Sequence, residues 1–272
     1  MKRWRVIDTG YLDCYSNMAI DEALLEVYEP SIELPVLRLY GWKPQAFSIG
    51  YFQNPKDELN LDRCRSEGIN FARRITGGGV IFHKNELTYS IVCSKGDLGF
   101  STFSKEAYRT LCSFIIKAYQ NLGLKAEYSL QETTRHSNSW FCFSEREKYD
   151  ILVNGKKIGG NAQRRKKEII FQHGSIPLSS DLNQAISLLR NELNIDKTKI
   201  ISLGQALGRD ISYNRVKSLL IESFQQVFSV DIVEKGLSQR ETSHYNILLN
   251  EKYATKEWNL YRDVGRSKAH VA

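Results

Sequence analysis

The chain has 272 residues, of which 42% are hydrophobic and 25% charged, so its composition is that of a globular protein and excludes a disordered or fibrous chain. Its 38 Lys and Arg residues exceed its 31 Asp and Glu residues, and the net charge of +7 favours an acidic partner: a nucleic acid, an anionic membrane surface, an acidic protein or a nucleotide. No apolar run is long enough to cross a bilayer and the N-terminal residues lack the apolar centre of a secretory signal, so we expect a cytoplasmic protein without a membrane partner.

The first predicted element is a helix over residues 16–28, where apolar side chains recur at helical spacing. Ser16 or Asn17 is expected to cap this helix, and Asp21 and Glu22 are expected to lie in its first turn, at the positive end of the helix dipole. The next predicted elements are two short strands and a helix, over residues 36–40, 46–51 and 59–67.

Three consecutive glycines at positions 77–79 lie between predicted strands over residues 71–75 and 80–83. Such a run costs chain entropy, and close passage of the backbone over a ligand is the usual reason to keep it; the alternative is a long mobile hairpin. Arg73 and Arg74 precede the glycines and are placed to bind an anion. No Gly-Lys-Ser/Thr follows and no helix opens there, so the motif is not a P-loop.

The middle of the chain combines a strand, a helix and an aromatic block. Residues 87–94 alternate between apolar and other side chains, which predicts a half-buried strand. Residues 105–122 form a clear amphipathic helix whose apolar stripe suits core packing. A polar surface loop is expected at 131–138, and the block at 140–143 then places aromatic side chains on both sides of Cys142.

The stretch over residues 148–178 is interpreted as one hairpin. The apolar run at 151–153 meets Asn154-Gly155, which is the strongest short signal for a hairpin turn. The apolar run at 169–171 is its predicted second strand.

The turn region of this predicted hairpin carries Lys157 beside Gly159 and Gly160. Glycines let a backbone approach a ligand closely, and a lysine beside them can meet an anion or a polarised carbonyl. A run of four cations at 164–167 follows. The alternative is a plain surface hairpin with solvated charges, and spacing alone leaves both interpretations open.

Beyond residue 178 the predicted elements are helical. Asp181 is expected to cap the first helix, and Ser238 and Glu241 have capping-box spacing at the start of the third. The three helices are expected over residues 182–193, 213–228 and 238–253. We therefore predict an α+β fold in which mixed β-sheets are flanked by helices, with a helical C-terminal extension. The predicted division is a core domain over residues 1–180, a helical extension over 181–262 packed on the same domain, and a frayed tail over 263–272.

The cysteines give no sign of a disulfide framework or a metal site. There are five, no pair has CxxC spacing, and a reducing compartment fits. Cys14, Cys64, Cys93 and Cys112 are expected to be buried and structural, which is the common fate of a free cysteine. Without zinc-finger spacing or an RNA-recognition signature, no nucleic-acid partner is expected.

With these residues in view, the chain resembles the lipoate/octanoate transferase and ligase family, whose catalytic fold is shared with biotin–protein ligases. Order and spacing match over most of the first 180 residues. The matching stretches are NMAIDE at 17–22, RRITGGGVIFH at 73–83, GKKIGGNAQRR at 155–165 and QHGSI at 172–176.

Three features resemble the octanoyltransferase branch of that family in particular. They are ELTYS at 86–90, the residues from Lys252 to Asn259, and Cys142, which lies where that branch places its acyl-accepting cysteine. Gly79 argues the other way, because it completes a triple glycine as in the ligases. ATP-dependent ligation therefore stays open.

The resemblance implies a catalytic pair, Cys142 and Lys157. Cys142 would take the acyl group as a thioester, and Lys157 would favour its thiolate and stabilise the negative charge that develops on the carbonyl oxygen. The implied donor is octanoyl-acyl carrier protein, and the implied acceptor is a lysine of a lipoyl domain such as the glycine-cleavage H protein. No cofactor is implied, with ATP and Mg²⁺ needed only by a ligase. The implied substrate-binding residues are Arg73, Arg74, Thr76, Gly77, Gly78, Gly79, His83, Gly160, Ala162, His173 and Ser175.

Several roles around this pair remain open. His83 and His173 match family positions but are assigned no chemistry, because a buried histidine is more often structural than an acid or base. Val80 and Phe82 are candidates to line a tunnel for the acyl chain, and the cations at 164–167 are candidates for a rim that attracts acidic partners. The alternatives to an octanoyltransferase are an ATP-dependent lipoate ligase, an amidotransferase between lipoyl domains, and a non-catalytic binding module.

Overall fold

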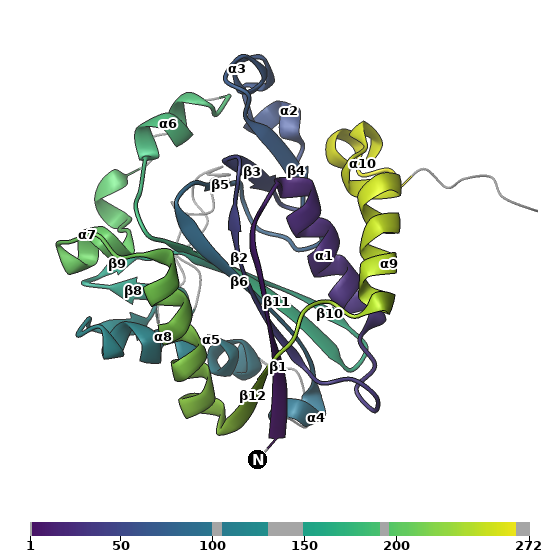
Figure 1. Cartoon of the computed structure of the whole chain (residues 1–272). Coiled ribbons are helices and arrows are strands. Elements are labelled where there is room, and N and C mark those ends of the chain that lie inside the picture. The colour runs from purple at the N-terminus through teal and green to yellow at the C-terminus, as the bar shows by residue number, and fades with distance from the viewer. Residues whose placement is uncertain (1, 100–104, 130–148, 191–195, 265–272) are drawn as a thin grey trace, which may run out of the picture.

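The computed structural model describes residues 2–99, 105–129, 149–190 and 196–264. Its centre is a six-stranded mixed sheet with the strand order β10-β11-β6-β2-β1-β12 (Figure 1). β1 pairs in parallel with β2 and β12, and the other neighbours are antiparallel. The strands of this main sheet are β1 (Lys2–Leu12), β2 (Val36–Trp42), β6 (Glu86–Ser94), β10 (Gly160–Lys166), β11 (Ile169–Pro177) and β12 (Val230–Glu234).

Two three-stranded sheets stand beside the main sheet. In the first, β3 is the middle strand and runs parallel to β4 and antiparallel to β5. In the second, β8 is the middle strand and is antiparallel to β7 and β9. Their strands are β3 (Ala46–Ile49), β4 (Asn70–Arg73), β5 (Ile81–His83), β7 (Ala126–Tyr128), β8 (Ile151–Val153) and β9 (Lys156–Lys157).

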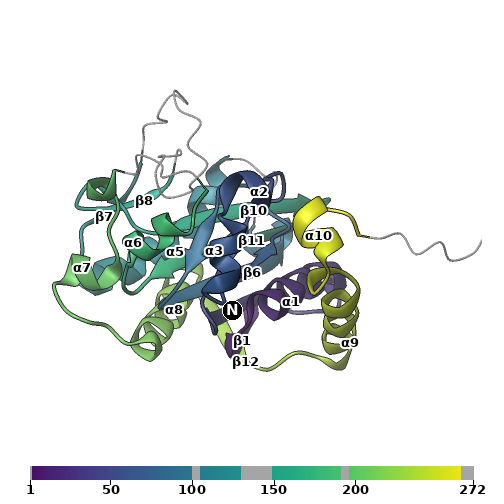
Figure 2. The same cartoon turned by 90° about the horizontal axis from the view of Figure 1, so that it is seen from above.

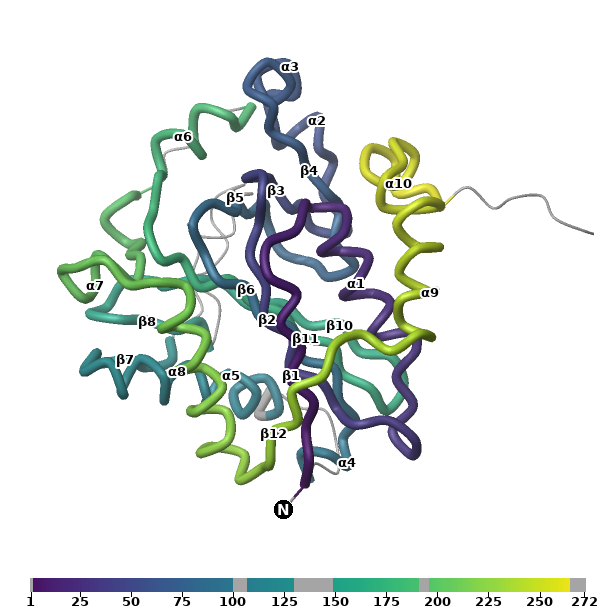
Figure 3. Tube along the Cα trace, viewed as in Figure 1, coloured from purple at the N-terminus to yellow at the C-terminus, as the bar shows by residue number. Residues whose placement is uncertain are grey.

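Helices cover both faces of the main sheet, as the trace in Figure 3 also shows. One core, which includes Trp4 and Phe224, lies between the sheet and α5 and α8. The other, which includes Val92 and Phe171, lies between the sheet and α1 with the C-terminal helices. The helices are α1 (Cys14–Val27), α2 (Pro55–Glu58), α3 (Leu61–Ser66), α4 (Lys95–Leu98), α5 (Lys105–Asn121), α6 (Leu182–Ser187), η1 (Lys197–Lys199), α7 (Leu203–Leu207), α8 (Tyr213–Phe228), α9 (Gln239–Leu248), η2 (Leu249–Tyr253) and α10 (Lys256–Tyr261). The predicted α+β class, with mixed sheets flanked by helices, is confirmed.

One prediction about β6 was wrong because helices cover both faces of the main sheet. The alternation over residues 87–94 predicted a half-buried strand, but all nine residues of β6 are buried. Since helices pack on both faces, the Thr and Ser positions of this strand are buried instead of facing water. There they hydrogen-bond: Ser90 donates to Asp21 at 2.7 Å.

The first helix begins two residues earlier than its sequence suggested. Asp13, not Ser16 or Asn17, is the N-cap of α1, and its carboxylate accepts from the backbone N–H groups of residues 15 and 16. Asp21 and Glu22 therefore lie mid-helix and are buried. The prediction that they stabilise the helix dipole from the first turn was wrong.

The stretch over residues 148–178 forms two hairpins instead of one. Asn154 and Gly155, with φ of 51° and 71°, make the predicted turn, but this turn joins β8 to the two-residue strand β9. The apolar run at 169–171 pairs instead with β10, in the main sheet. Gly159 therefore lies where the chain crosses from one sheet to the other.

The C-terminal segment is mostly helical, as predicted, and it also supplies a strand that was not predicted. α8 and the capping box at the start of α9 agree with their predictions, while α6 is shorter than expected. β12 continues the main sheet beyond β1. Figure 2 shows that the segment spans the molecule, with α7 near one end and α9 and α10 at the other.

Some predictions fall on parts of the chain outside the described residues. These are the loop at 131–138, the aromatic block at 140–143 with Cys142, and all but the first two residues of the tail at 263–272. Within the ranges that are described, every helix is too short or too polar to traverse a bilayer.

Candidate active site

Arg74 holds the glycine loop, residues 77–79, by hydrogen bonds to its backbone. The buried guanidinium donates to the carbonyl oxygen of Gly77 at 2.8 and 3.2 Å and to that of Gly79 at 2.7 Å. Gly78 has φ of +92°, and a Cβ added to Gly50 would lie only 1.9 Å from the Gly78 oxygen. Glycine at position 50 is therefore what lets the loop pack against the end of β3. Arg74 shapes the loop through these contacts, and its direct contact with substrate stays a prediction.

Arg73 joins the strand before the loop to the C-terminal helix α10. Its guanidinium donates to the carbonyl oxygens of Trp258 at 3.1 Å and Asn259 at 3.0 Å. It also donates to those of Gly50 at 3.2 Å and Tyr51 at 2.9 Å. A buried arginine surrounded by carbonyl oxygens braces the structure. The predicted contact of Arg73 with an anionic substrate stays a prediction.

His83, at the end of β5, and Glu86, at the start of β6, form a buried hydrogen-bonded pair. His83 Nδ1 lies 2.7 Å from Glu86 Oε1, its Nε2 lies 2.7 Å from Ser48 Oγ, and Trp42 stacks on the imidazole with 3.6 Å between ring centroids. Ser175 donates to Glu86 Oε2 at 2.6 Å. Burial alone would raise the pKa of Glu86, but the neighbouring His83 and these hydrogen bonds outweigh it and hold the pKa below its ordinary value. Glu86 is therefore a charged anchor between β5, β6 and β11.

A second buried network connects α1 to the residue before the glycine loop. Asp21 accepts from Arg38 at 2.7 Å and from Ser90 at 2.7 Å, and its Oδ2 lies 3.5 Å from His173 Nδ1. His173 Nε2 in turn lies 2.7 Å from Thr76 Oγ1. Burial lowers the pKa of His173 despite the nearby Asp21, so the imidazole is neutral at pH 7. Burial by itself would raise the pKa of Asp21. The charge of Arg38 and the contact with His173 outweigh burial, so the pKa of Asp21 is lowered.

Lys157 lies at the end of β9 and is paired with a carboxylate. Its Nζ is 2.8 Å from Asp150 Oδ2, and both side chains are buried, with 3% and 5% of their surface exposed. The Lys157 carbonyl oxygen accepts from the backbone N–H of Ile201 at 3.0 Å. Such a pair keeps a buried ammonium charged and fixed in place. The predicted partner, Cys142, lies outside the described residues, so the pairing of Cys142 with Lys157 stays a prediction.

The register between β10 and β11 brings together four predicted site residues. Gly160 lies opposite Ser175, and Ala162 lies opposite His173. Gly159, with φ of +80°, passes so close to β11 that an added Cβ would lie 2.1 Å from the Ser175 oxygen. Gly159 therefore allows a close approach to the neighbouring strand, and the predicted approach of this glycine pair to a ligand stays a prediction.

The four cysteines in the described ranges are buried, as predicted. Burial raises the pKa of the Cys64 thiol to about 11 and that of Cys112 to about 12, and it raises those of Cys14 and Cys93 still further from the ordinary value. These thiols are therefore weak nucleophiles at neutral pH.

A hollow beside β9 contains one of the two residues proposed for an acyl tunnel. Phe82 lines it together with Glu86, Ile200 and Ile201. Val80 is instead packed in the small core beside the three-stranded sheet of β3, β4 and β5.

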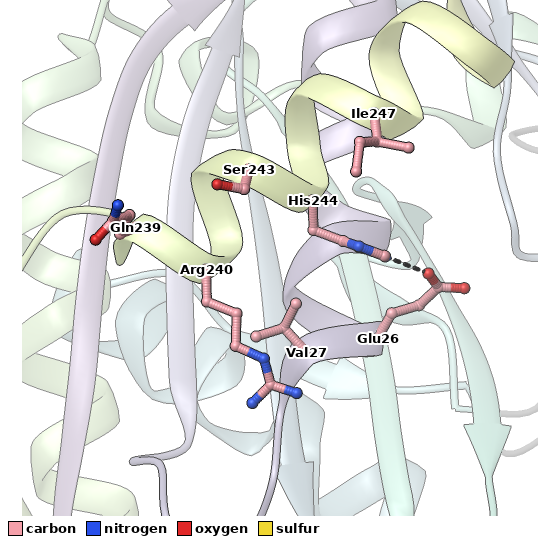
Figure 4. Close-up of a pocket in the computed structure, with 7 residues that line it drawn as sticks. All are labelled: Glu26, Val27, Gln239, Arg240, Ser243, His244 and Ile247. Carbon is pink, nitrogen blue, oxygen red and sulfur yellow. Dashed lines mark hydrogen bonds and ion pairs between the residues drawn. The ribbon is translucent and has the colours of Figure 1, made fainter.

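A separate surface pocket lies between α1 and α9 (Figure 4). Its lining includes Val27, Ile247, and His244, whose Nε2 lies 2.6 Å from Glu26 Oε2. None of the predicted site residues lines it.

Sequence reasoning missed Asp21, Glu86 and Asp150 as members of the site. Asp21 lies within the NMAIDE motif, Glu86 opens ELTYS, and Asp150 directly precedes the strand before Asn154-Gly155. Each carboxylate precedes or interrupts a buried apolar run, which was the available signal. No group of three His, Cys, Asp or Glu side chains suited to a metal ion occurs in the described part of the chain.

Comparisons with known proteins agree on one family. Residues 13–225 match the family described as the lipoyl protein ligase A/B catalytic domain. An octanoyltransferase LipM of Bacillus subtilis is 34% identical to this chain, and the aligned region covers 95% of this chain and 98% of that protein. A crystal structure of lipoate-protein ligase A bound with ATP superposes with a TM-score of 0.80 at 26% identity, covering 96% of this chain and 99% of that one. A bi-partite lipoate protein ligase of Thermoplasma acidophilum, described with its E2 lipoyl domain, gives a TM-score of 0.79 at 25% identity and covers 96% of each chain.

Proposed function

The chain belongs to the family of lipoyl protein ligase A/B catalytic domains, and we propose that it is an acyltransferase that moves an octanoyl group onto a lysine of a lipoyl domain. The observation that carries this proposal is the near full-length similarity to a protein named octanoyltransferase LipM. The lipoyl-domain acceptor is supported by the ligase described with its E2 lipoyl domain. We further propose octanoyl-acyl carrier protein as the donor and the glycine-cleavage H protein as one acceptor.

The proposed chemistry is two acyl transfers through Cys142. The thiolate of Cys142 attacks the carbonyl carbon of the donor thioester, a new C–S bond forms, and the carrier leaves as its own thiolate. The amine of the acceptor lysine then attacks the acyl-enzyme. A C–N bond forms, the bond to Cys142 breaks, and the proton that the amine loses passes to solvent, while Lys157 remains an ammonium. The other four cysteines are buried and have raised thiol pKa values, which supports Cys142 as the reactive one of the five.

Lys157 supports both steps as a fixed positive charge. An ammonium held by Asp150 cannot swing freely, so it can be aimed at the position where negative charge develops on the carbonyl oxygen. The glycine loop, held by Arg74, offers backbone in place of side chains next to the acyl group. In the proposed reaction, the Cys142 sulfur lies close to the Lys157 ammonium.

The thioester is tested by the mass of the intact protein after incubation with octanoyl-acyl carrier protein. We expect one octanoyl increment that hydroxylamine removes, and we expect the Cys142→Ala variant to show none. Cys64→Ala is the matched control, since it removes a buried thiol on α3 and should still be acylated. An increment that persists in Cys142→Ala would exclude the proposed nucleophile.

The role of Lys157 is tested by comparing two adjacent lysines. Lys157→Ala should slow both half-reactions by about 100-fold, because an oriented cation near a developing oxyanion contributes on that scale. Lys156 is exposed on the same short strand, so Lys156→Ala should retain the rate of the unmodified protein. Single-turnover rates measure each step, and equal rates for the two variants would remove Lys157 from the mechanism.

An ATP-dependent lipoate ligase is the second candidate function. It is favoured by the triple glycine and by the similarity to a lipoate-protein ligase A that binds ATP. In that case Lys157 would stabilise an acyl-adenylate and Cys142 would be dispensable. Supplying lipoate, ATP and Mg²⁺ with a lipoyl domain separates the two, because only a ligase modifies the domain without an acyl donor. Transfer from one lipoyl domain to another would appear instead as ATP-independent exchange between two domains.

A further inference from the structure

An exposed cluster of aromatic rings and guanidinium groups lies next to the glycine loop. We name it the loop-side patch and define it as Tyr51, Phe52, Arg164 and Arg262. Phe52 is 79% exposed, and its ring centroid is 4.9 Å from that of Tyr51. The Arg262 guanidinium lies 5.1 Å from the Tyr51 ring and 5.7 Å from the Phe52 ring, and that of Arg164 lies 5.7 Å from the Tyr51 ring.

The patch is attached directly to the strand end that carries the loop. The Tyr51 backbone N–H donates to the carbonyl oxygen of Thr76 at 2.8 Å, and Arg164 donates to that of Ile75 at 2.9 Å. Arg73 also donates to the Tyr51 carbonyl oxygen. A molecule that contacts the patch therefore lies close to the residues that lead into the glycine loop.

The chemistry of the patch is that of a protein-binding surface. An exposed Phe has no folding benefit from burial, whereas aromatic and arginine side chains are the residues that dominate binding energy at interfaces. On the neighbouring segments, one positive charge at Lys56 is outnumbered by three negative charges, at Asp57, Glu257 and Asp263. Arg164 instead begins the run of four exposed cations at 164–167, so the patch adds to a positive surface.

We propose that the loop-side patch docks the acidic protein domain that presents the acceptor lysine. The proposal rests on the proposed function, in which a folded domain must bring an amine to the glycine loop. A lysine side chain is short, so its domain has to sit against the rim of the site. A thioester donor on a long flexible carrier arm can reach in from farther away. The apolar rings supply contact area, and the cations steer the acidic domain and set its orientation.

The experiment measures binding and transfer separately, with a purified lipoyl domain whose lysine is unmodified. Phe52→Ala and Arg262→Glu should each weaken binding of the domain by about tenfold or more, as expected for interface anchor residues. Arg262→Glu should also reduce the salt dependence of binding. The same variants should raise the KM for the lipoyl domain. The rate at which the enzyme is acylated, and the rate at which hydroxylamine removes the acyl group, should equal those of the unmodified protein.

Two matched variants control for surface effects elsewhere. Ile32→Ala removes an apolar side chain that is 75% exposed in another loop, and Arg65→Glu reverses a charge on the exposed face of α3. Neither should change binding of the lipoyl domain. Unchanged binding in Phe52→Ala and Arg262→Glu would overturn the proposal, and so would variants that raise only the KM for the carrier-protein donor. If the unmodified protein transfers no octanoyl group, the proposed function fails, while the binding constants still decide whether the patch docks the domain.

Discussion

At the residue scale, several buried acidic and basic side chains of the candidate site lie in close pairs. Asp21 with Arg38, Glu86 with His83, and Lys157 with Asp150 each lie within 2.8 Å. A buried ion pair contributes little net stability, but removal of one partner leaves an expensive charge. Such pairs therefore hold backbone segments in one arrangement, here α1 with β2, β5 with β6, and the start of β8 with β9.

Glu58 provides a residue-scale prediction about pH. Burial raises the pKa of this carboxyl to about 7, and nearby Asp57 adds to the shift. Between about pH 4.5 and 7 the unfolded chain releases this proton while the folded chain keeps it, so this group makes the free energy of unfolding fall as pH rises. A glutamine at position 58 does not titrate, so the Glu58→Gln variant does not lose this stability. The melting temperature of the variant minus that of the unmodified protein should therefore be about 2–4 °C higher at pH 8 than at pH 5.

Thermal unfolding at the two pH values checks this expectation. Glu222 on α8 is exposed, so Glu222→Gln should show the same difference from the unmodified protein at both pH values. A Glu58→Gln variant that gains stability as the pH falls instead of as it rises would contradict the argument.

At the element scale, the glycine loop depends on the end of β3. A Cβ at position 50 would meet the Gly78 carbonyl oxygen at 1.9 Å, a contact with backbone that cannot rotate away. We expect Gly50→Ala to push the loop out of place and lower kcat/KM for octanoyl transfer by about tenfold or more, since small displacements at a site have large effects on rate.

The matched control for this variant is Gly236→Ala. An added Cβ there meets no atom within 4 Å, so the variant makes the same chemical change without a clash. Its kcat/KM should equal that of the unmodified protein. Full activity in Gly50→Ala would show that the contact between β3 and the loop has no part in the reaction.

At the scale of the whole molecule, the C-terminal segment is joined to the front of the chain by strands and by buried ion pairs. β12 extends the main sheet next to β1, and Arg5 pairs with Glu241. Lys252 Nζ lies 2.6 Å from Glu22 Oε2 of α1. Elements that share one sheet and one core are expected to unfold together.

The expected outcome is a single cooperative transition in denaturant for the whole chain. Lys252→Met should destabilise the protein by about 3 kcal/mol because it leaves Glu22 buried with one fewer partner, and the double variant with Glu22→Gln should recover part of that loss. Both should still show one transition by circular dichroism and by tryptophan fluorescence. Two separate transitions would instead support 181–262 as an independent unit.

The sequence by itself determined the elements whose signals are local. The helix of α8, the turn at Asn154-Gly155 and the capping box at the start of α9 follow from periodicity and from residues within a few positions of each other. The motifs were also sufficient to indicate the family, because its members share particular residue types at fixed spacing, whereas the catalytic role of Lys157 stays a prediction.

Only the tertiary structure decided which segments meet. β1 and β12 pair across more than 200 residues, the stretch at 148–178 is divided between two sheets, and Arg73 is enclosed by carbonyl oxygens from α10. Asp150 became a partner of Lys157 in the same way. These outcomes depend on long-range pairing and on burial of both sheet faces, and side-chain periodicity along a single segment contains no information about either.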